Sequence, residues 1–61
     1  MKEMSCDELL VGLSVRVISS DQSLNEIMQF QGQLGDLLFF HHPKLNVTVQ
    51  LDFVSVMIFD S

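Results

Sequence analysis

His41 and His42 are the two histidines of the 61-residue chain, and imidazole is the side chain best suited to bind a metal ion or exchange a proton near neutral pH. Neighbouring residues of an extended segment point to opposite sides, so these two rings do not chelate one ion together. A zinc site would need two further ligands, for example Cys6 and Asp36. No spacing in the sequence indicates such a set. We expect polar turn residues beside Pro43, with a pH-sensitive contact to a partner as the functional alternative.

The other side chains that carry chemistry also lack a catalytic pattern. A single cysteine, Cys6, excludes an internal disulfide, and its neighbours Asp7 and Glu8 do not supply the cationic environment that a nucleophilic thiol needs. The acidic residues are spread along the chain without the spacing of a calcium loop. Gly32 and Gly35 are not followed by the lysine of a phosphate-binding loop. We therefore predict no catalytic, metal or cofactor site and no enzymatic activity.

The charge of the chain limits its partners. Eight acidic and three basic residues give a formal net charge of −5. Sequence-independent binding of nucleic acid needs cations to neutralise phosphates, and anionic membranes attract basic segments. We expect neither class of partner. The acidic residues form a solvated surface or, alternatively, a surface that meets a basic patch on another protein.

The N-terminal segment is polar, and we expect residues 1–8 to be a leader in front of one small domain, residues 9–61. Ser5 and Glu8 have the spacing of a capping box, so the leader either frays or forms one helical turn. It lacks the apolar run of a secretory signal, and no stretch approaches the roughly 20 apolar residues of a membrane span. With one free thiol, a reducing cytoplasm is the expected compartment.

Alternating apolar and polar residues predict a mainly β fold. The chain has no Ala, whereas Val, Ile and Thr together supply 11 residues. Period-2 alternation predicts strands near residues 13–18 and 46–52, with a phase shift near Asp52 and Phe53 before a last strand at 54–59. A turn is expected at residues 41–44.

Residues 23–40 fit two interpretations. Ser23 and Glu26 have capping-box spacing, and an apolar helical stripe follows, but Gly32 and Gly35 would each destabilise a helix by about 1 kcal/mol. We expect one helical turn or short helix at about 23–28, and then a strand from Phe30 to about residue 40, bent at Gly35.

This order of strands resembles a small SH3-like barrel, the group that includes KOW and Sm-like modules. The segment from Leu10 to Val17 is similar to the entry strand of such barrels, and the segments 31–35 and 46–52 are similar to their second and third strands. The resemblance covers about residues 10–59. It implies a barrel of four to five antiparallel strands with one short helical turn.

Two narrower resemblances lie within that group. Gly32, Leu34 and Asn46 are similar to the Gly-x-Leu and Asn of Sm-like proteins. The segment from Val47 to Asp52 resembles a strand of accessory barrels of photosynthetic electron transfer, such as the small barrel protein of photosystem I and the variable chain of ferredoxin–thioredoxin reductase. Those accessory barrels bind partners and hold no cofactor.

Two apolar segments have more hydrophobic side chains than one interior can take. In a strand, Phe39 and Phe40 face opposite sides, and so do Met57 and Phe59 relative to their neighbours. One side chain of each pair then needs cover from a partner, a second copy or the leader. The predicted partner-binding residues are Phe39, Phe40, Met57, Phe59, His41 and His42.

We therefore expect a small acidic protein-binding or adaptor module with an outward apolar patch and an acidic rim, which also forms homo-oligomers. One alternative is a regulator of the phage or mobile-element type that blocks a basic nucleic-acid-binding surface of a host protein. The other is an oligomeric barrel enzyme whose active site forms at an interface. Gln31, Gly32 and Gln33 resemble a strand of small tetrameric barrel reductases, without their catalytic motif.

Overall fold

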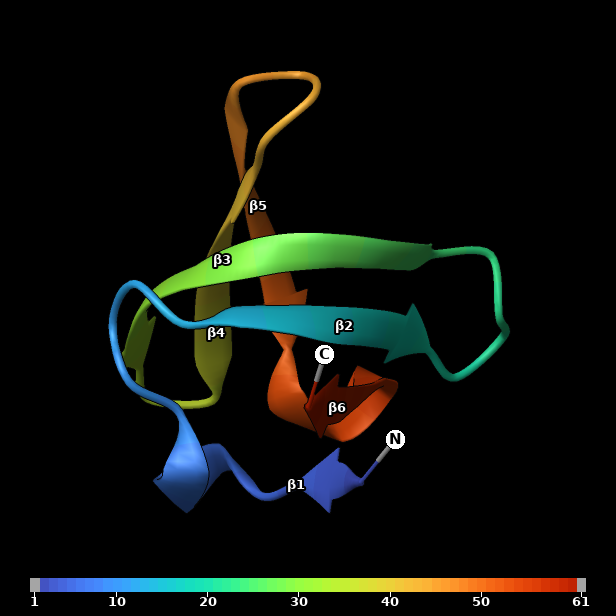
Figure 1. The fold of residues 1–61 in the computed structure, drawn as a ribbon. Coiled ribbons are helices and arrows are strands. Elements are labelled where there is room, and N and C mark those ends of the chain that lie inside the picture. The colour runs from blue at the N-terminus through green and yellow to red at the C-terminus, as the bar shows by residue number, and fades with distance from the viewer. Residues whose placement is uncertain (1, 61) are drawn as a thin grey trace.

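The structure, a computed structural model, describes residues 2–60, and six strands of this part form one antiparallel sheet (Figure 1). The mainly β prediction is confirmed, although the strands number six and not four or five. The sheet order is β1-β6-β2-β3-β4-β5. The strands are β1 (Glu3–Met4), β2 (Ser14–Ser19), β3 (Asn25–Leu34), β4 (Leu37–His42), β5 (Val47–Asp52) and β6 (Val56–Asp60), with 3-10 turns η1 (Cys6–Glu8) and η2 (Phe53–Ser55).

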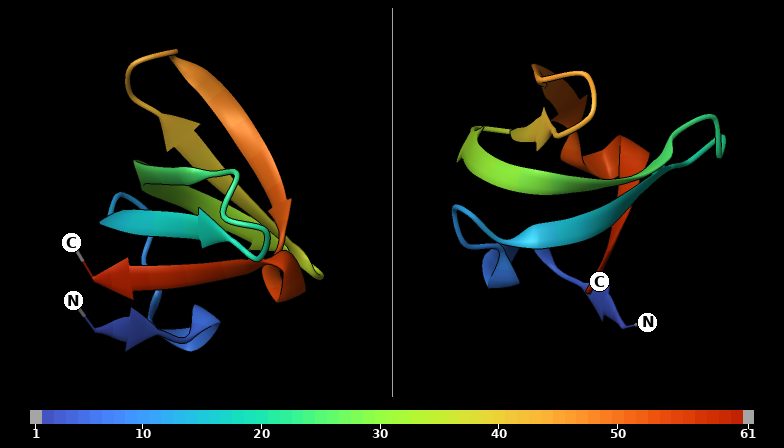
Figure 2. Two further views of the ribbon diagram at one scale, coloured as in Figure 1. Left: turned by 90° about the vertical axis from the view of Figure 1, so that its right-hand side faces the viewer. Right: turned by 45° about the horizontal axis from the view of Figure 1, so that its top comes forward.

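Strands β2 to β5 follow one another as a meander, and β6 returns to pair with the first strand of the meander, β2. The sheet is strongly twisted, so the β4–β5 hairpin crosses the direction of β2 and β3 at a steep angle (Figures 1 and 2). The sheet does not close, because β1 and β5 form its two edges. The N-terminal and C-terminal ends lie side by side, where the Asp60 N–H donates to the Lys2 carbonyl (2.8 Å).

The expected helix at residues 23–28 is wrong, because β3 begins at Asn25. Pairing with β2 sets Ile27 opposite Arg16 and Glu26 opposite Val17. The hydroxyl of Ser23, expected to cap a helix, instead donates to Asp21 (2.7 Å). A strand partner with a matching apolar face outweighs the local helical pattern.

The single strand expected over residues 30–40 is two strands joined by a tight turn. Gly35 lies in that turn with φ +59°, a left-handed conformation that glycine adopts without strain. The register shifts between Phe30 and Gly32, which makes Gln31 the extra residue of a β-bulge. Gly35 therefore reverses the chain, and the irregularity within the strand lies at Gln31.

The turn expected at residues 41–44 begins later, because both histidines belong to β4 and the turn spans 43–46. The strand predicted at 46–52 is confirmed as β5. The predicted phase shift after it is confirmed: the 3-10 turn η2 lies there. Asp52 caps the start of this turn, because its Oδ1 accepts the Val54 N–H (3.1 Å). Val54 lies in this turn, so the last strand starts at Val56.

The segment expected as a polar leader contributes β1, which pairs with β6 by setting Glu3 opposite Phe59 and Met4 opposite Ile58. Of the two alternatives for this segment, fraying or one helical turn, the structure shows the turn, η1, where the Ser5 N–H donates to Glu8 Oε1 (3.0 Å). Within residues 2–60, no helix is long and apolar enough to cross a membrane.

The core lies inside the curl of the sheet. Its largest fully buried side chain is Phe40, which packs edge-to-face on Phe30 across the β3–β4 pair with ring centroids 5.6 Å apart. Such pairs contribute beyond the area that they bury. The buried apolar residues are Leu9, Val15, Val17, Met28, Phe30, Leu38, Phe40 and Ile58.

Candidate protein-binding face

The four predicted site residues of β4 alternate between the two sides of the sheet. Phe40 and His42 are buried on the inner side, whereas Phe39 and His41 are half-buried on the outer side. Because Phe40 has no exposed surface, it is a core residue that no partner can touch in this fold. Of the phenylalanine doublet, one ring is thus inside and the other outside.

Met57 and Phe59 of β6 lie together on the outer side of the sheet, opposite the buried Ile58. The register sets Ile18 beside Met57 and Arg16 beside Phe59. It also sets Ile27 of β3 beside Arg16. Four apolar side chains from three adjacent strands therefore share one surface, which we call the outer apolar face: Ile18, Ile27, Met57 and Phe59.

The outer apolar face is partly solvated. Ile27 is 42% exposed and Met57 is 37% exposed, while Ile18 and Phe59 are half-buried. Phe39 does not join this group, because it lies opposite Gly32, five residues along β3 from Ile27. The sequence prediction missed Ile18 and Ile27. The alternation of residues 13–18 contained a signal for Ile18, because it continues the side of Ser14 and Arg16.

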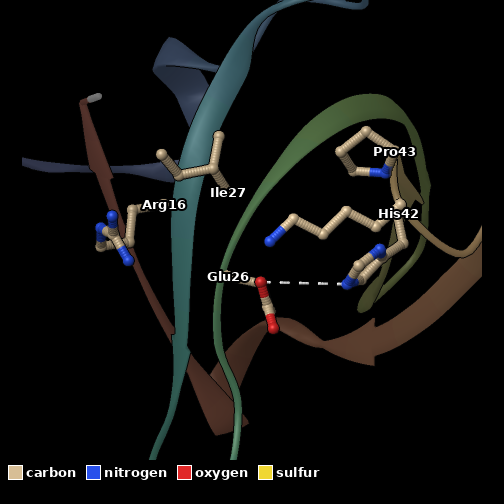
Figure 3. A pocket seen from close by; sticks show the side chains of 6 residues that line it. Arg16, Glu26, Ile27, His42 and Pro43 are labelled. Atoms are coloured by element: carbon tan, nitrogen blue, oxygen red, sulfur yellow. Dashed lines mark ion pairs between the residues drawn. The ribbon is translucent and has the colours of Figure 1, made fainter.

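A hollow of about 280 Å³ adjoins the outer apolar face (Figure 3). It holds two of the three basic residues of the chain, Arg16 and Lys44, in an otherwise acidic protein. Arg16 is fixed there by donating from Nη1 to Asn25 Oδ1 (2.6 Å). The hollow is lined by Arg16, Glu26, Ile27, His42, Pro43 and Lys44.

His42 and Glu26 face each other in this hollow, with 3.9 Å between Nε2 and Oε2 (Figure 3). The other ring nitrogen, Nδ1, accepts the Leu45 N–H of the β4–β5 turn (3.2 Å). In the neutral ring that bond leaves the proton on Nε2, on the side of the carboxylate. The hollow therefore presents charges of both signs beside the apolar side chain of Ile27.

The structure does not bring the side chains of a metal site together. Within residues 2–60, no three His, Cys, Asp or Glu side chains form a group that could hold a metal ion. Cys6 packs half-buried against the core in η1. Asp36 lies in the β3–β4 turn, and its carbonyl accepts the Phe53 N–H (3.0 Å).

A second hollow, of about 420 Å³, lies beside the β2–β3 loop and is lined by Ser19, Ser20, Asp21, Ser23, Val54 and Ser55. Asp21 Oδ1 accepts the hydroxyls of Ser19 and Ser23 (each 2.7 Å) and the Ser23 N–H (3.0 Å). These bonds close the loop on itself, so we interpret Asp21 as the residue that holds this turn.

The same bonds predict a pH dependence of stability. The hydroxyl of Ser19, followed by the hydroxyl and N–H of Ser23, lowers the pKa of Asp21 from 3.8 to about 2. The folded state therefore binds fewer protons than the unfolded state, and the stabilising contribution of Asp21 is complete above pH 3.8 and lost as the pH falls to about 2. We expect the free energy of unfolding to fall more steeply across this range in the wild type than in Asp21→Asn. Urea unfolding at a series of pH values measures both slopes, and equal slopes would contradict the assignment.

Comparison of the chain with known proteins gives no match. No family model matches the chain, and neither a curated protein nor a solved structure shows significant similarity to it. The fold and the outer apolar face define a small antiparallel β protein with a partly solvated apolar surface.

Proposed function

We propose that this protein is a small, non-enzymatic protein-binding module that uses the outer apolar face as its contact surface. The observation that carries the proposal is the gathering of Ile18, Ile27, Met57 and Phe59 by the pairing of three strands. Scattered single apolar residues are ordinary on a protein surface, whereas adjacent ones rimmed by polar groups mark interaction sites. Glu3 beside Phe59 and Glu26 in the hollow provide acidic groups at the border.

Charged side chains in the adjoining hollow would orient a partner on the outer apolar face. A partner that covers Ile27 also reaches Arg16, Lys44 and the pair of Glu26 and His42. Charges at the border of an interface add specificity and speed of association more than affinity. The net charge of −5 favours a partner with a basic surface, and binding to such a surface weakens as salt is raised.

We also propose that the sheet is an open relative of the small SH3-like barrels. The support is its topology: a four-strand meander, a 3-10 turn after it, and a last strand that folds back beside the first strand of the meander. The steep crossing of the β4–β5 hairpin over β2 and β3 gives the curl that such a barrel needs (Figure 2).

Affinity capture with charged variants tests the proposed surface. Met57→Lys and Ile27→Lys place an ammonium group on the outer apolar face, at positions exposed enough to leave the fold intact. Leu34→Lys is the matched control, because Leu34 is 72% exposed at the far end of β3. The tagged wild type and the control should retain the same protein from extracts of the source cells, and both face variants should lose it.

Two outcomes of this capture experiment would contradict the proposed surface. Retention of that protein by all four folded chains would show that binding does not use the outer apolar face. Loss from the Leu34→Lys control as well would assign the effect to added charge in general. Circular dichroism of each chain establishes beforehand that the variants keep the sheet.

A further inference from the structure

The two edges of the sheet differ in length. One edge is β1, which has two residues, and the other is β5, which has six. Edge strands present unpaired backbone groups, and proteins protect them by shortness, lysine, proline or bulges. β1 is protected by its shortness. β5, with the sequence Val-Thr-Val-Gln-Leu-Asp, contains no lysine, proline or glycine and pairs with β4 without a register shift.

The register identifies which backbone groups of β5 point away from the sheet. Antiparallel pairs alternate between hydrogen-bonded and non-hydrogen-bonded positions. The Phe53 N–H bonds to the Asp36 carbonyl, so the next pair, Asp52 and Leu37, is non-hydrogen-bonded. By the same alternation, Thr48, Gln50 and Asp52 direct their N–H and C=O groups outward.

The side chains of β5 also do not prevent another strand from pairing with this edge. Asp52 is its one charged residue, and its carboxylate is occupied in accepting the Val54 N–H of η2. Val49 and Leu51 pack against the core but stay half-buried, and Val47 is 46% exposed. A further strand beside β5 would cover the apolar surface that these side chains still expose.

We propose that β5 pairs antiparallel with β5 of a second copy of this chain, with Gln50 opposite Gln50 of that copy, to form a two-fold symmetric dimer with one continuous sheet. Outward groups of Gln50 bond each other in this register, and Val49 lies opposite Leu51 on the inner side. Thr48 lies opposite Asp52, so no like charges meet. Pairing with β1 of another copy could align only two residues, which favours the closed dimer over an open chain of copies.

A charge swap at the two-fold axis tests both the edge and the register. The full chain should sediment as a concentration-dependent dimer of the 6.9 kDa protomer. In the proposed register, Gln50→Lys or Gln50→Glu alone sets two like charges opposite each other and should weaken the dimer about fivefold or more. An equimolar mixture of the two variants should restore dimerisation, because opposite charges then meet. Gln29→Lys, which changes an exposed glutamine of β3 away from both edges, is the control and should leave the dimer unchanged.

Three results would overturn the proposal. The first is a wild-type chain that remains monomeric up to millimolar concentration. The second is a mixture of Gln50→Lys and Gln50→Glu that associates no better than either variant alone. The third is a dimer that Met57→Lys abolishes and the Gln50 variants leave intact, because that dimer would use the outer apolar face. This test needs no other partner, so its failure is separate from failure of the proposed function.

Discussion

Phe40→Ala should lower the free energy of unfolding by about 3–5 kcal/mol, the usual loss for truncating a fully buried phenylalanine. Phe40 has no exposed surface and is the largest fully buried side chain. The substitution also removes the ring that packs edge-to-face on Phe30. A chain of 61 residues has a thin stability margin. We therefore expect the variant to be largely unfolded at 25 °C, as measured by urea denaturation followed by circular dichroism.

Phe39→Ala is the matched control, because it removes the same ring from the neighbouring position of β4. Phe39 lies half-buried on the outer side and faces Gly32 and Gln50. The variant should stay folded and lose less than about half as much stability, since less apolar area returns to water. Equal losses in the two variants would contradict the assignment of inner and outer sides in β4.

Ile58→Lys should prevent folding, whereas Met57→Lys should not. Ile58 is 3% exposed in the core, and a buried ammonium group without a partner destabilises the folded state by several kcal/mol. Met57, one residue earlier, points to the outer side, where lysine can extend into water. We expect a change of at most about 1 kcal/mol for Met57→Lys, as is usual for a surface substitution.

Amide spectra of the two lysine variants provide the measurement. Met57→Lys should give the dispersed amide resonances of a folded sheet, and Ile58→Lys should give the narrow dispersion of an unfolded chain. Dispersed spectra from both variants would mean that Ile58 does not belong to the core. The opposite pattern would mean that the register of β6 is shifted by one residue.

The strands with clear alternation could be predicted from the sequence. In residues 13–18 and 46–52, the side-chain period of two indicates both the strand and the side that packs on the core, and the structure agrees, with Val15 and Val17 buried in β2 and Val49 and Leu51 half-buried in β5. Phe39 and Phe40 also follow this rule, as do Met57 and Phe59 relative to Ile58, but the structure was needed to show which side of each strand faces outward.

The errors fall where long-range pairing decides the structure. Asn25 to Met28 have a helical pattern locally, but β2 offers them a strand partner, and no local rule contains that partner. The pairing of β1 with β6 joins the two ends of the chain and is equally invisible to local patterns. The hollow could not be predicted either, because Arg16, Glu26 and Lys44 come from three separate segments.

The β-branched last strand illustrates the same limit. The sequence predicted that apolar side chains of this strand need cover from a partner, a second copy or the leader. In the structure β2 lies on one side of β6, and β1 covers Ile58 and Phe59 on the other. Among residues 2–60, β5 is the longer of the two edge strands, and it pairs with β4 alone.

Amide chemical-shift mapping tests the central claim, that the outer apolar face binds a protein partner. The chain labelled with nitrogen-15 would be titrated with the protein retained by the wild type and by Leu34→Lys. The account predicts the largest shift changes at Arg16, Ile18, Ile27, Met57 and Phe59, with the β3–β4 turn at Gly35 unaffected. Largest changes at the Gly35 turn or along β5, with the outer apolar face unchanged, would contradict it.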